Sequence, residues 1–305
     1  MYLALFIAVI IIMAAISARG IRNNCTVLGK TNVIDSEILG EKRKIWVYVP
    51  PCAKDPANHH QRYPVVYLLD GNSLFASVNG IVQELTGIKG TRECPDMIVV
   101  AIPNTNRLRD LTPTNYMYGP EGDKINGFEA TGGGNLFIDF IEQELIPYID
   151  SVYPTSANKT ILGHSLGGLA VMNMLINRPQ LFDAYIAIDP SMWWDGKKLL
   201  KQAWEVLRSE SYHGKSLYLG IANNMPAGMD VQEVRKDTSP QMAHMRSVLE
   251  LQDMLKVCSR NNGLKCSFKY YSECDHNSVS PKAGYDALRF LFSYQKQPQP
   301  LTGER

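Results

Sequence analysis

The chain has 305 residues, with 31 Lys and Arg against 30 Asp and Glu, so its formal charge at pH 7 is +1. This length fits one large domain or two small ones and is ample for a buried core. Hydrophobic residues make up 45% of the chain and charged residues 20%, which excludes the composition of a disordered protein. The balanced charge argues against a nucleic-acid partner, because such a protein needs a surplus of basic residues to neutralise phosphates.

The chain begins with an apolar stretch typical of a targeting segment. Residues 2–18 are uncharged and rich in Ile, Leu, Ala and Met, and Arg19 follows directly. The stretch is slightly shorter than the roughly 20 residues that span a bilayer, and Ala15 and Ser17 are small residues that suit a signal peptidase. We therefore expect residues 1–18 to be a cleaved signal peptide of a secreted or extracytoplasmic protein. An uncleaved membrane anchor is the alternative, and contact with a membrane is expected only in that case.

The even number of cysteines, six, is compatible with pairing in an oxidising compartment. Cys258 and Cys266 are the best local candidates for a disulfide, because an Asn-Asn-Gly turn lies between them. Buried free thiols are the alternative. Neither a C-x-x-C pair nor an H-E-x-x-H motif occurs, so the sequence predicts no metal site. Asn24 and Asn158 each begin a glycosylation sequon.

The pattern of apolar residues predicts an α/β protein. Residues 31–39 and 44–49 are expected to form an antiparallel hairpin with Gly40 in its turn. Short apolar runs, typical of strands buried on both faces of a parallel sheet, then occur at residues 65–69, 97–102, 160–162, 184–188, 216–221 and 266–271. Segments with helical spacing alternate with them at residues 74–86, 136–149, 169–177, 198–207, 240–258 and 281–294. This alternation predicts an open, mostly parallel central sheet with helices on both faces.

No repeat or linker divides the chain, so we expect one domain over residues 28–295 and a frayed C-terminal tail over residues 296–305. Residues 103–134 form the one long irregular stretch. A loop of this length inside a compact domain is usually functional. This one follows a buried strand, at the edge where α/β sheets bind their ligands.

The sharpest motif is Gly163-His164-Ser165-Leu166-Gly167, which contains G-x-S-x-G between a predicted strand and a predicted helix. This order is the one that a nucleophile elbow requires. The turn forces Ser165 into a strained conformation, and the flanking glycines leave room for it. The hydroxyl is thereby raised above the sheet, and the amide of Leu166 points toward a developing oxyanion. An ordinary serine at a helix start is the alternative.

A serine hydroxyl needs a neighbouring base to act as a nucleophile at neutral pH. His276 follows the last predicted strand and precedes the final helix, which is where this topology places the base. His213 lies before a strand and His244 lies within a helical pattern, so both are interpreted as surface residues. His164 is expected to point away from Ser165 because of the turn.

The acid that would orient His276 is ambiguous. Asp189 directly follows the strand at residues 184–188, whereas Asp230 comes only after a long excursion from the strand at residues 216–221. The position favours Asp189 slightly. A loop-capping role is the alternative for each aspartate, and a Ser/His pair without an acid is a third possibility.

Further residues are candidates for holding the substrate. Gly71 and Asn72 follow the strand at residues 65–69, where the second oxyanion donor is expected. Trp193 and Trp194 are candidates for lining the acyl or alcohol pocket. Core packing of at least one of the two tryptophans is the alternative.

Several motifs in order resemble one enzyme family: RYPVVYLLDG at residues 62–71, VVAIPNTNR at 99–107, RDLTP at 109–113, GHSLGG at 163–168, DPS with the tryptophan pair at 189–194, and DHNSV at 275–279. Over about residues 31–294 the chain resembles the esterase branch of the α/β-hydrolase superfamily, the enterochelin esterase-like hydrolases. The resemblance implies the α/β-hydrolase fold, Ser165 as nucleophile and His276 as base. Many members carry a glutamate where this chain has Asn223 and Asn224, and serine where it has Asp189. We infer that the carboxylate has moved to Asp189.

Two classes of function follow from these residues. The first is a serine hydrolase that cleaves small-molecule carboxylic esters through an acyl-enzyme, without a cofactor. An acyltransferase would use the same chemistry with another acceptor. The second class is a secreted binding protein with a hydrolase fold and no turnover. The presence of both Ser165 and His276 counts against it.

Overall fold

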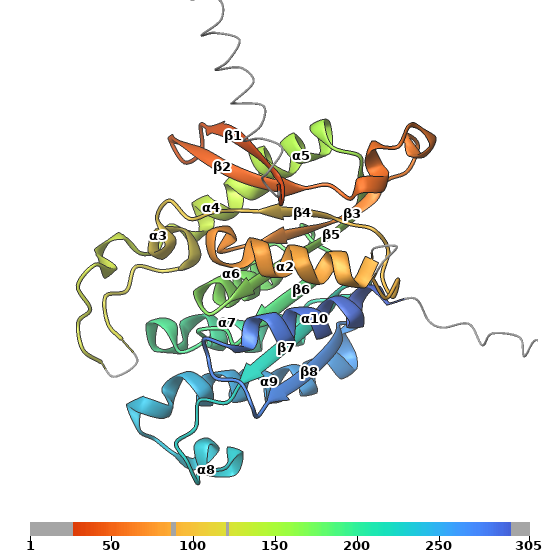
Figure 1. The fold of residues 1–305 in the computed structure, drawn as a ribbon. Helices are drawn as coiled ribbons and strands as arrows, with labels where there is room; N and C mark the ends of the chain where they lie inside the picture. Colours follow the sequence, from red (N-terminus) through yellow and green to blue (C-terminus); the bar gives the residue numbers. More distant parts are fainter. Residues whose placement is uncertain (1–26, 87–89, 120–121, 294–305) are drawn as a thin grey trace, which may run out of the picture.

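The computed structural model describes residues 27–86, 90–119 and 122–293, which form an eight-stranded sheet covered by helices (Figure 1). The expected signal segment at residues 1–18 and the tail at residues 296–305 lie outside the described residues. Within the described ranges, no helix is long and apolar enough to cross a membrane.

The sheet is mostly parallel. Its strands are β1 (Lys30–Ser36), β2 (Glu41–Tyr48), β3 (Tyr63–Leu68), β4 (Ile98–Ala101), β5 (Thr155–His164), β6 (Ala184–Ile188), β7 (Ser216–Ala222) and β8 (Lys265–Tyr271). Their order across the sheet is β1-β2-β4-β3-β5-β6-β7-β8. The pairs β1–β2 and β2–β4 are antiparallel, and the other neighbours are parallel. The predicted α/β architecture with an N-terminal hairpin is confirmed. Strand β5 starts five residues before its apolar run, because its first half is polar and more exposed.

Nine α-helices are described. They are α2 (Gly71–Thr86), α3 (Arg107–Leu111), α4 (Gly134–Phe140), α5 (Ile146–Val152), α6 (Leu166–Asn177), α7 (Trp194–Ser209), α8 (Val231–Lys236), α9 (Ala243–Asn262) and α10 (Val279–Phe292). A π-helical turn (Ile141–Leu145) joins α4 to α5, so the helix predicted at residues 136–149 has three parts. Helices α3 and α8 were not predicted, because five or six residues are too few to show a helical hydrophobic period.

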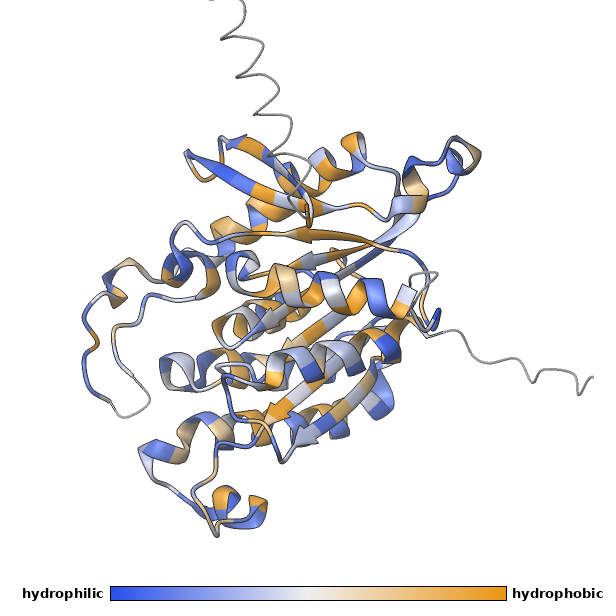
Figure 2. Cartoon of the chain, in the orientation of Figure 1, coloured by the Kyte–Doolittle hydropathy of each residue, from blue (hydrophilic) through white to orange (hydrophobic). Residues whose placement is uncertain are grey.

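The central strands are buried on both faces of the sheet. Successive residues of a strand point to opposite faces. Val65 and Tyr67 of β3 accordingly belong to one core cluster, shared with α6 and α9, whereas Val66 and Leu68 belong to another, shared with α2 and α10. Figure 2 shows the central strands largely in orange, while the helices that cover them carry both colours. Burial on two sides explains why the strands appear in the sequence as nearly continuous apolar runs.

The strand order places several polar residues along one edge of the sheet. Strands β3, β5, β6, β7 and β8 are parallel neighbours, so their carboxyl ends lie side by side. Asp70, Ser165, Asp189, Asn224 and His276 each follow one of these five strands within a few residues. The carboxyl edge of such a sheet is where α/β proteins bind their ligands.

The stretch from residue 103 to residue 134 is more ordered than predicted. It contains α3 and a short 3-10 turn (Phe128–Ala130). The side chain of Asn106 accepts a 3.1 Å hydrogen bond from the amide of Arg109 and so caps α3. The prediction of an irregular loop is therefore wrong over residues 107–111.

All five cysteines in the described part of the chain are free thiols. The disulfide between Cys258 and Cys266 is therefore wrong, and the alternative of free thiols describes both residues. Burial raises the pKa of the Cys266 thiol to about 12. This thiol consequently stays protonated at neutral pH and is a poor nucleophile.

Candidate active site

Ser165 lies in a strained turn between β5 and α6, with φ 59° and ψ −119°. A positive φ is uncommon for any residue other than glycine. Gly163 makes the turn possible, since a Cβ at that position would lie 2.3 Å from the carbonyl oxygen of Gly167. The Ser165 amide donates to the Ile188 carbonyl and the Ser165 carbonyl accepts from the Ser191 amide, both at 3.0 Å. The segment after β6 thus holds Ser165 in its strained conformation.

Three side chains from different strands form a chain of hydrogen bonds. Ser165 Oγ lies 3.0 Å from His276 Nε2, and His276 Nδ1 lies 2.6 Å from Asp189 Oδ2. The His276 side chain is 31% exposed, whereas Asp189 is fully buried. The hydroxyl of Ser191 lies 3.3 Å from Ser165 Oγ. This arrangement can move a proton from the Ser165 hydroxyl to an imidazole that a carboxylate orients.

The Asp189 carboxylate is stabilised in its ionised form. Burial by itself would raise the pKa of Asp189, but hydrogen bonds from His244 and His276 outweigh burial and hold that pKa well below its usual range. The amide of Ala222 adds a 3.1 Å hydrogen bond to Oδ1. The carboxylate is therefore charged at neutral pH, although it has no contact with solvent.

Asn224 links the acid to the base. Its Nδ2 donates a 3.1 Å hydrogen bond to Asp189 Oδ2, and its Oδ1 accepts a 2.9 Å hydrogen bond from the amide of His276. The side chain of the adjacent Asn223 donates to the Ser272 carbonyl at 2.8 Å. The two asparagines therefore tie the loop after β7 to the loop after β8, at the position where the resembling family carries a glutamate.

Asp230 has a different role from the one considered for it. Its carboxylate accepts hydrogen bonds from the amides of Gln232 and Glu233, and the Glu233 side chain accepts one from the Asp230 amide. This is a capping box at the start of α8. The proposal of Asp230 as the orienting acid is wrong, because its carboxylate caps a helix and Asp189 is the acid bonded to His276.

Two histidines lie closer to the site than predicted. His244 Nε2 is 2.9 Å from Asp189 Oδ2, so the interpretation of His244 as a surface residue is wrong. The connection from β7 to β8 returns from the carboxyl edge of the sheet, so the first turn of α9 lies at that edge. This topological signal could have located His244. The ring of His164 packs 4.6 Å from the ring of His276, so His164 does not point away from the site.

The structure separates the three candidates for oxyanion donors. The amide of Gly71 already donates to the Ile102 carbonyl at 3.0 Å, so Gly71 is not available as a donor. Its lack of a side chain serves packing, since a Cβ there would lie 2.8 Å from the Ile102 amide nitrogen. Among the hydrogen bonds of the described residues, the amides of Asn72 and Leu166 have no acceptor. Both amides lie in the first turn of a helix, where such groups are unpaired within the helix.

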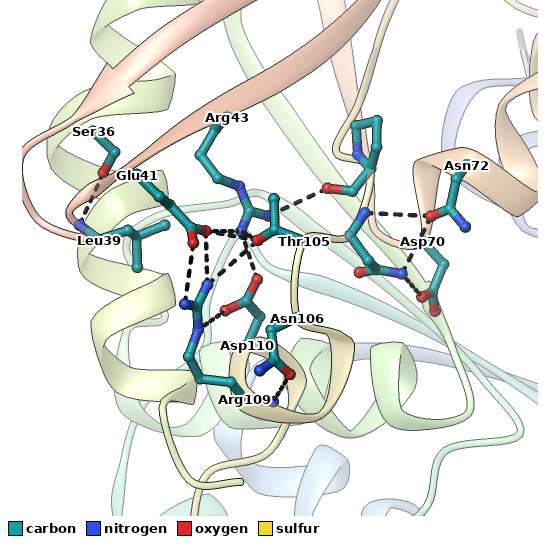
Figure 3. Close-up of polar contacts among 12 residues, drawn as sticks. Ser36, Leu39, Glu41, Arg43, Asp70, Asn72, Thr105, Asn106, Arg109 and Asp110 are labelled. Atoms are coloured by element: carbon teal, nitrogen blue, oxygen red, sulfur yellow. Dashed lines mark hydrogen bonds and ion pairs between the residues drawn. The ribbon is translucent and has the colours of Figure 1, made fainter. Parts of the chain in front are cut away.

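A polar network supports the loop that bears Asn72. Asp70, with φ 53°, accepts two hydrogen bonds from Arg107 and one from Asn104. A second cluster joins the hairpin to α3 (Figure 3). Its ion pairs link the buried Arg43 with Asp110 and Glu41, and Arg109 with the same two carboxylates. The hydrogen bond from Arg109 is the largest cause that lowers the pKa of Glu41 to about 2.

The two tryptophans have different surroundings. Trp194 is buried, and its Nε1 donates to the hydroxyl and carbonyl oxygens of Thr114 at 3.2 and 3.3 Å. Trp194 is therefore a core residue, and its proposed place in the substrate pocket is wrong. Trp193 is half-buried and lines a pocket of ≈ 410 Å³ with Tyr116, Gly196, Lys197 and others. Ala243, the residue before His244, also lines this pocket.

The described residues include one group that has the composition of a metal site. The ligand atoms of Asp189, His244 and His276 lie within 4.8 Å of one another. Their separations of 2.6 and 2.9 Å are those of hydrogen bonds. Ligands around a tetrahedral zinc ion, at about 2.0 Å from it, are about 3.3 Å apart. The geometry of this cluster therefore suits a hydrogen-bonded relay.

Comparisons with known proteins agree on one family. The family model described as "Putative esterase" matches residues 36–256. The ferri-bacillibactin esterase of Bacillus subtilis (strain 168) is 31% identical over 285 residues, which cover 89% of this chain and 92% of that protein. The siderophore triacetylfusarinine C esterase of Aspergillus fumigatus is 28% identical over 253 residues, covering 79% of this chain and 85% of that protein.

Solved structures show the same relationship. An IroE-like serine hydrolase from Shewanella oneidensis has a TM-score of 0.77 and 36% identity, and the match covers 87% of this chain and 80% of that one. The siderophore hydrolase EstB from Aspergillus nidulans has a TM-score of 0.70 and 25% identity, with 90% and 98% of the two chains covered.

Proposed function

The chain belongs to the esterase family described by that model, within the α/β-hydrolase superfamily, and we propose that it hydrolyses carboxylic esters with Ser165 as nucleophile. That it is a carboxyl-ester hydrolase follows from the family. The assignment of roles rests on one observation: Ser165 Oγ, both nitrogens of His276 and the Asp189 carboxylate form a continuous hydrogen-bonded chain. A strained turn presents the hydroxyl at the carboxyl edge of the sheet.

The proposed reaction has two halves. In the first, His276 Nε2 takes the proton of Ser165 as Oγ attacks the ester carbonyl carbon, and then gives that proton to the departing alkoxide. The acyl group is left on Ser165, and the alcohol is released. In the second half, His276 takes a proton from water as the hydroxide attacks the acyl carbon. The bond between that carbon and Ser165 Oγ then breaks, the proton returns to Oγ, and the carboxylic acid is released. Asp189 stays ionised throughout and stabilises the imidazolium.

The negative charge that develops on the carbonyl oxygen needs hydrogen-bond donors. We assign the amide of Leu166, at the start of α6, as one donor. The amide of Asn72, at the start of α2, is the other. Both assignments are supported by the lack of any acceptor for these amides among the described residues. Each donor of this kind typically contributes about 10²- to 10³-fold to the rate.

The substrate class comes from the relatives. Three of them are esterases named for siderophores: triacetylfusarinine C, ferri-bacillibactin and enterobactin. We propose that this chain also hydrolyses an ester of the siderophore type. The pocket beside Trp193 is proposed to receive part of this substrate. Two aromatic residues of this pocket, Trp193 and Tyr116, together with Lys201 suit a bulky group with negative charge. Lys197, which also lines the pocket, is paired with Glu250 at 2.6 Å.

The location of the enzyme is also a proposal. The apolar stretch over residues 2–18 favours export through the secretory route, with the signal removed or retained as an anchor. Sequencing the N-terminus of the protein that cells release would test this. A mature chain that begins near residue 19 would support cleavage, whereas an intact Met1 on a membrane-bound protein would support the anchor.

Labelling with a fluorophosphonate tests the nucleophile. The wild-type protein is expected to become labelled at Ser165, and Ser165→Ala and His276→Ala should lose the label while remaining folded by circular dichroism. Mapping the modified peptide separates Ser165 from its neighbour Ser191. Hydrolysis of short-chain p-nitrophenyl esters, triacetylfusarinine C and enterobactin, each siderophore with and without iron, would then define the substrate. A folded wild-type protein that takes no label would contradict the proposed mechanism.

A further inference from the structure

The Asp189 carboxylate has more hydrogen-bond donors than the proposed mechanism uses. Its Oδ2 accepts from His276 Nδ1 at 2.6 Å, from His244 Nε2 at 2.9 Å and from Asn224 Nδ2 at 3.1 Å. The amide of Ala222 donates to the other oxygen at 3.1 Å. Asp189 is fully buried, and these four hydrogen bonds are the ones that its carboxylate accepts among the described residues. Two histidines therefore share one carboxylate oxygen, and only one of them contacts Ser165.

His244 reaches this contact from a partly buried position. It lies in the first turn of α9, its side chain is 17% exposed, and its carbonyl oxygen accepts a 2.7 Å hydrogen bond from the hydroxyl of Ser247. The rings of His244 and His276 meet edge to face, with centroids 4.8 Å apart. To donate to an ionised carboxylate, Nε2 of His244 must carry a proton, both in the neutral and in the charged form of the ring.

We propose that His244 is a positioning residue of the esterase: it fixes the Asp189 carboxylate and shares its negative charge with His276. This inference rests on the proposed function, in which Asp189 orients His276. A fixed carboxylate keeps the His276 ring aligned on Ser165 Oγ. Misalignment of reacting groups by about 1 Å can lower the rate of an enzyme about 10²-fold. The hydrogen bond from His244 also means that the negative charge of Asp189 acts on two imidazole rings and not on His276 alone.

Several charged or titratable groups face His276, and they determine the sign of the effect. Asp189 after β6 contacts His276 Nδ1 at 2.6 Å, and Asp275 directly precedes His276 in the same loop. His164 at the end of β5 stays neutral above about pH 4, because burial lowers its pKa to about 4. His244 on α9 opposes a positive charge on His276, by using Asp189 and, when charged, by repulsion. The two rings therefore compete for the same carboxylate oxygen, Oδ2 of Asp189.

Two substitutions separate these contributions. His244→Gln keeps an N–H donor for Asp189 but cannot become charged, whereas His244→Leu removes both the donor and the charge. We expect the acidic limb of the pH dependence of kcat/KM, measured with a p-nitrophenyl ester, to lie at higher pH in both variants than in the wild type. The difference from wild type should be smaller for His244→Gln than for His244→Leu. The kcat of His244→Leu should fall about ten- to a hundredfold with KM within about twofold, and Gln should restore most of that loss.

Proton NMR gives a readout that does not depend on turnover. The Nδ1 proton of His276 in a 2.6 Å hydrogen bond is expected at low field in the wild type. This resonance should move in His244→Leu and stay close to its wild-type position in His213→Gln, which changes an exposed histidine. A wild type that neither labels nor hydrolyses esters would remove the proposed function, but the resonance would still decide whether His244 acts on His276. Equal resonances, acidic limbs and kcat in His244→Leu and wild type would overturn the inference.

Discussion

The guanidinium of Arg107 binds Asp70 through two parallel hydrogen bonds, 2.7 Å from Nε to Oδ1 and 2.9 Å from Nη2 to Oδ2. Asp70 has a positive φ and directly precedes the turn of α2 that carries the Asn72 amide. Bidentate pairing of this type fixes orientation as well as charge. Arg107, from α3, therefore supports the backbone that is proposed to bind the oxyanion.

Replacing Arg107 with alanine is expected to lower kcat/KM about tenfold, because the Asn72 amide would be displaced but not lost. Outright loss of an oxyanion donor costs about 10²- to 10³-fold. Steady-state kinetics on a p-nitrophenyl ester would measure this. The control is Arg62→Ala, since Arg62 is exposed and its hydrogen bonds go to the carbonyls of His59 and Gln61. Equal kinetics for the two variants would contradict a role for Arg107 at the site.

Substitutions of Asp189 and Asp230 should have different effects, the first on kcat and the second on stability. Asp189→Asn should lower kcat about 10³- to 10⁴-fold, because an amide cannot stabilise the imidazolium and favours the wrong tautomer of His276. Asp230→Ala should leave kcat unchanged and reduce the free energy of unfolding by about 1 kcal/mol, because it removes the cap of α8. Kinetics and urea denaturation of both variants would test this pair. An active Asp189→Asn variant would mean that Asp189 does not act on His276.

The sequence located Ser165 and His276 because each occupies a defined place in a strand–helix pattern. The elbow is a local motif of five residues, and His276 follows the last strand. Asp230 could also have been interpreted correctly, since Asp-x-x-Glu before a short helical segment is the pattern of a capping box. From the sequence alone, Asp189 and Asp230 could be distinguished as candidate acids only by the number of residues that separate each from the preceding strand.

Contacts between distant segments were not predictable in the same way. His244 bonds to a residue 55 positions earlier in the chain. The topology of the β7–β8 connection indicates that the first turn of α9 lies at the carboxyl edge of the sheet, but a helical period does not report which residue that turn contacts. The Gly71 amide appeared free because the neighbouring strand that supplies the Ile102 carbonyl had no known register. Backbone hydrogen-bond partners across a sheet depend on that register.

The ion pair of Arg43 and Asp110 is buried, with Nη1 and Oδ2 2.6 Å apart and both side chains only 1% exposed. Arg43→Met should therefore reduce the free energy of unfolding by about 1–3 kcal/mol, because the buried Asp110 loses one of its two cationic partners and keeps only Arg109. The double variant Arg43→Met with Asp110→Leu should recover part of that loss. Urea denaturation would measure all three proteins.

A neighbouring residue supplies the control for this pair. Lys42, next to Arg43 on β2, pairs with Asp35, and both side chains are more than 70% exposed. Lys42→Met should change the free energy of unfolding by no more than about 0.5 kcal/mol, since exposed ion pairs contribute little. If Arg43→Met were as mild as Lys42→Met, the cluster in Figure 3 would not anchor the hairpin to α3.

His164 makes stability depend on pH. Burial, followed by repulsion from His276, lowers its pKa to about 4 from an ordinary value of 6.5. Between these two values the unfolded chain binds a proton that the folded protein excludes, so stability is complete above pH 6.5 and decreases as the pH falls toward 4. From pH 7 to pH 4.5, this one group should cost about 2.5 kcal/mol.

The variant His164→Gln removes the ionisable ring and should lose about 2.5 kcal/mol less than wild type over the same interval of pH. Urea denaturation at pH 7 and pH 4.5 gives the change in free energy of unfolding for each protein. Subtracting one change from the other removes the contribution of the carboxylates, which both proteins share. His213→Gln, in which the replaced ring is exposed, should lose stability in parallel with wild type. Equal losses of stability in all three proteins would show that the unfolded chain does not gain a proton at His164 between pH 7 and pH 4.5.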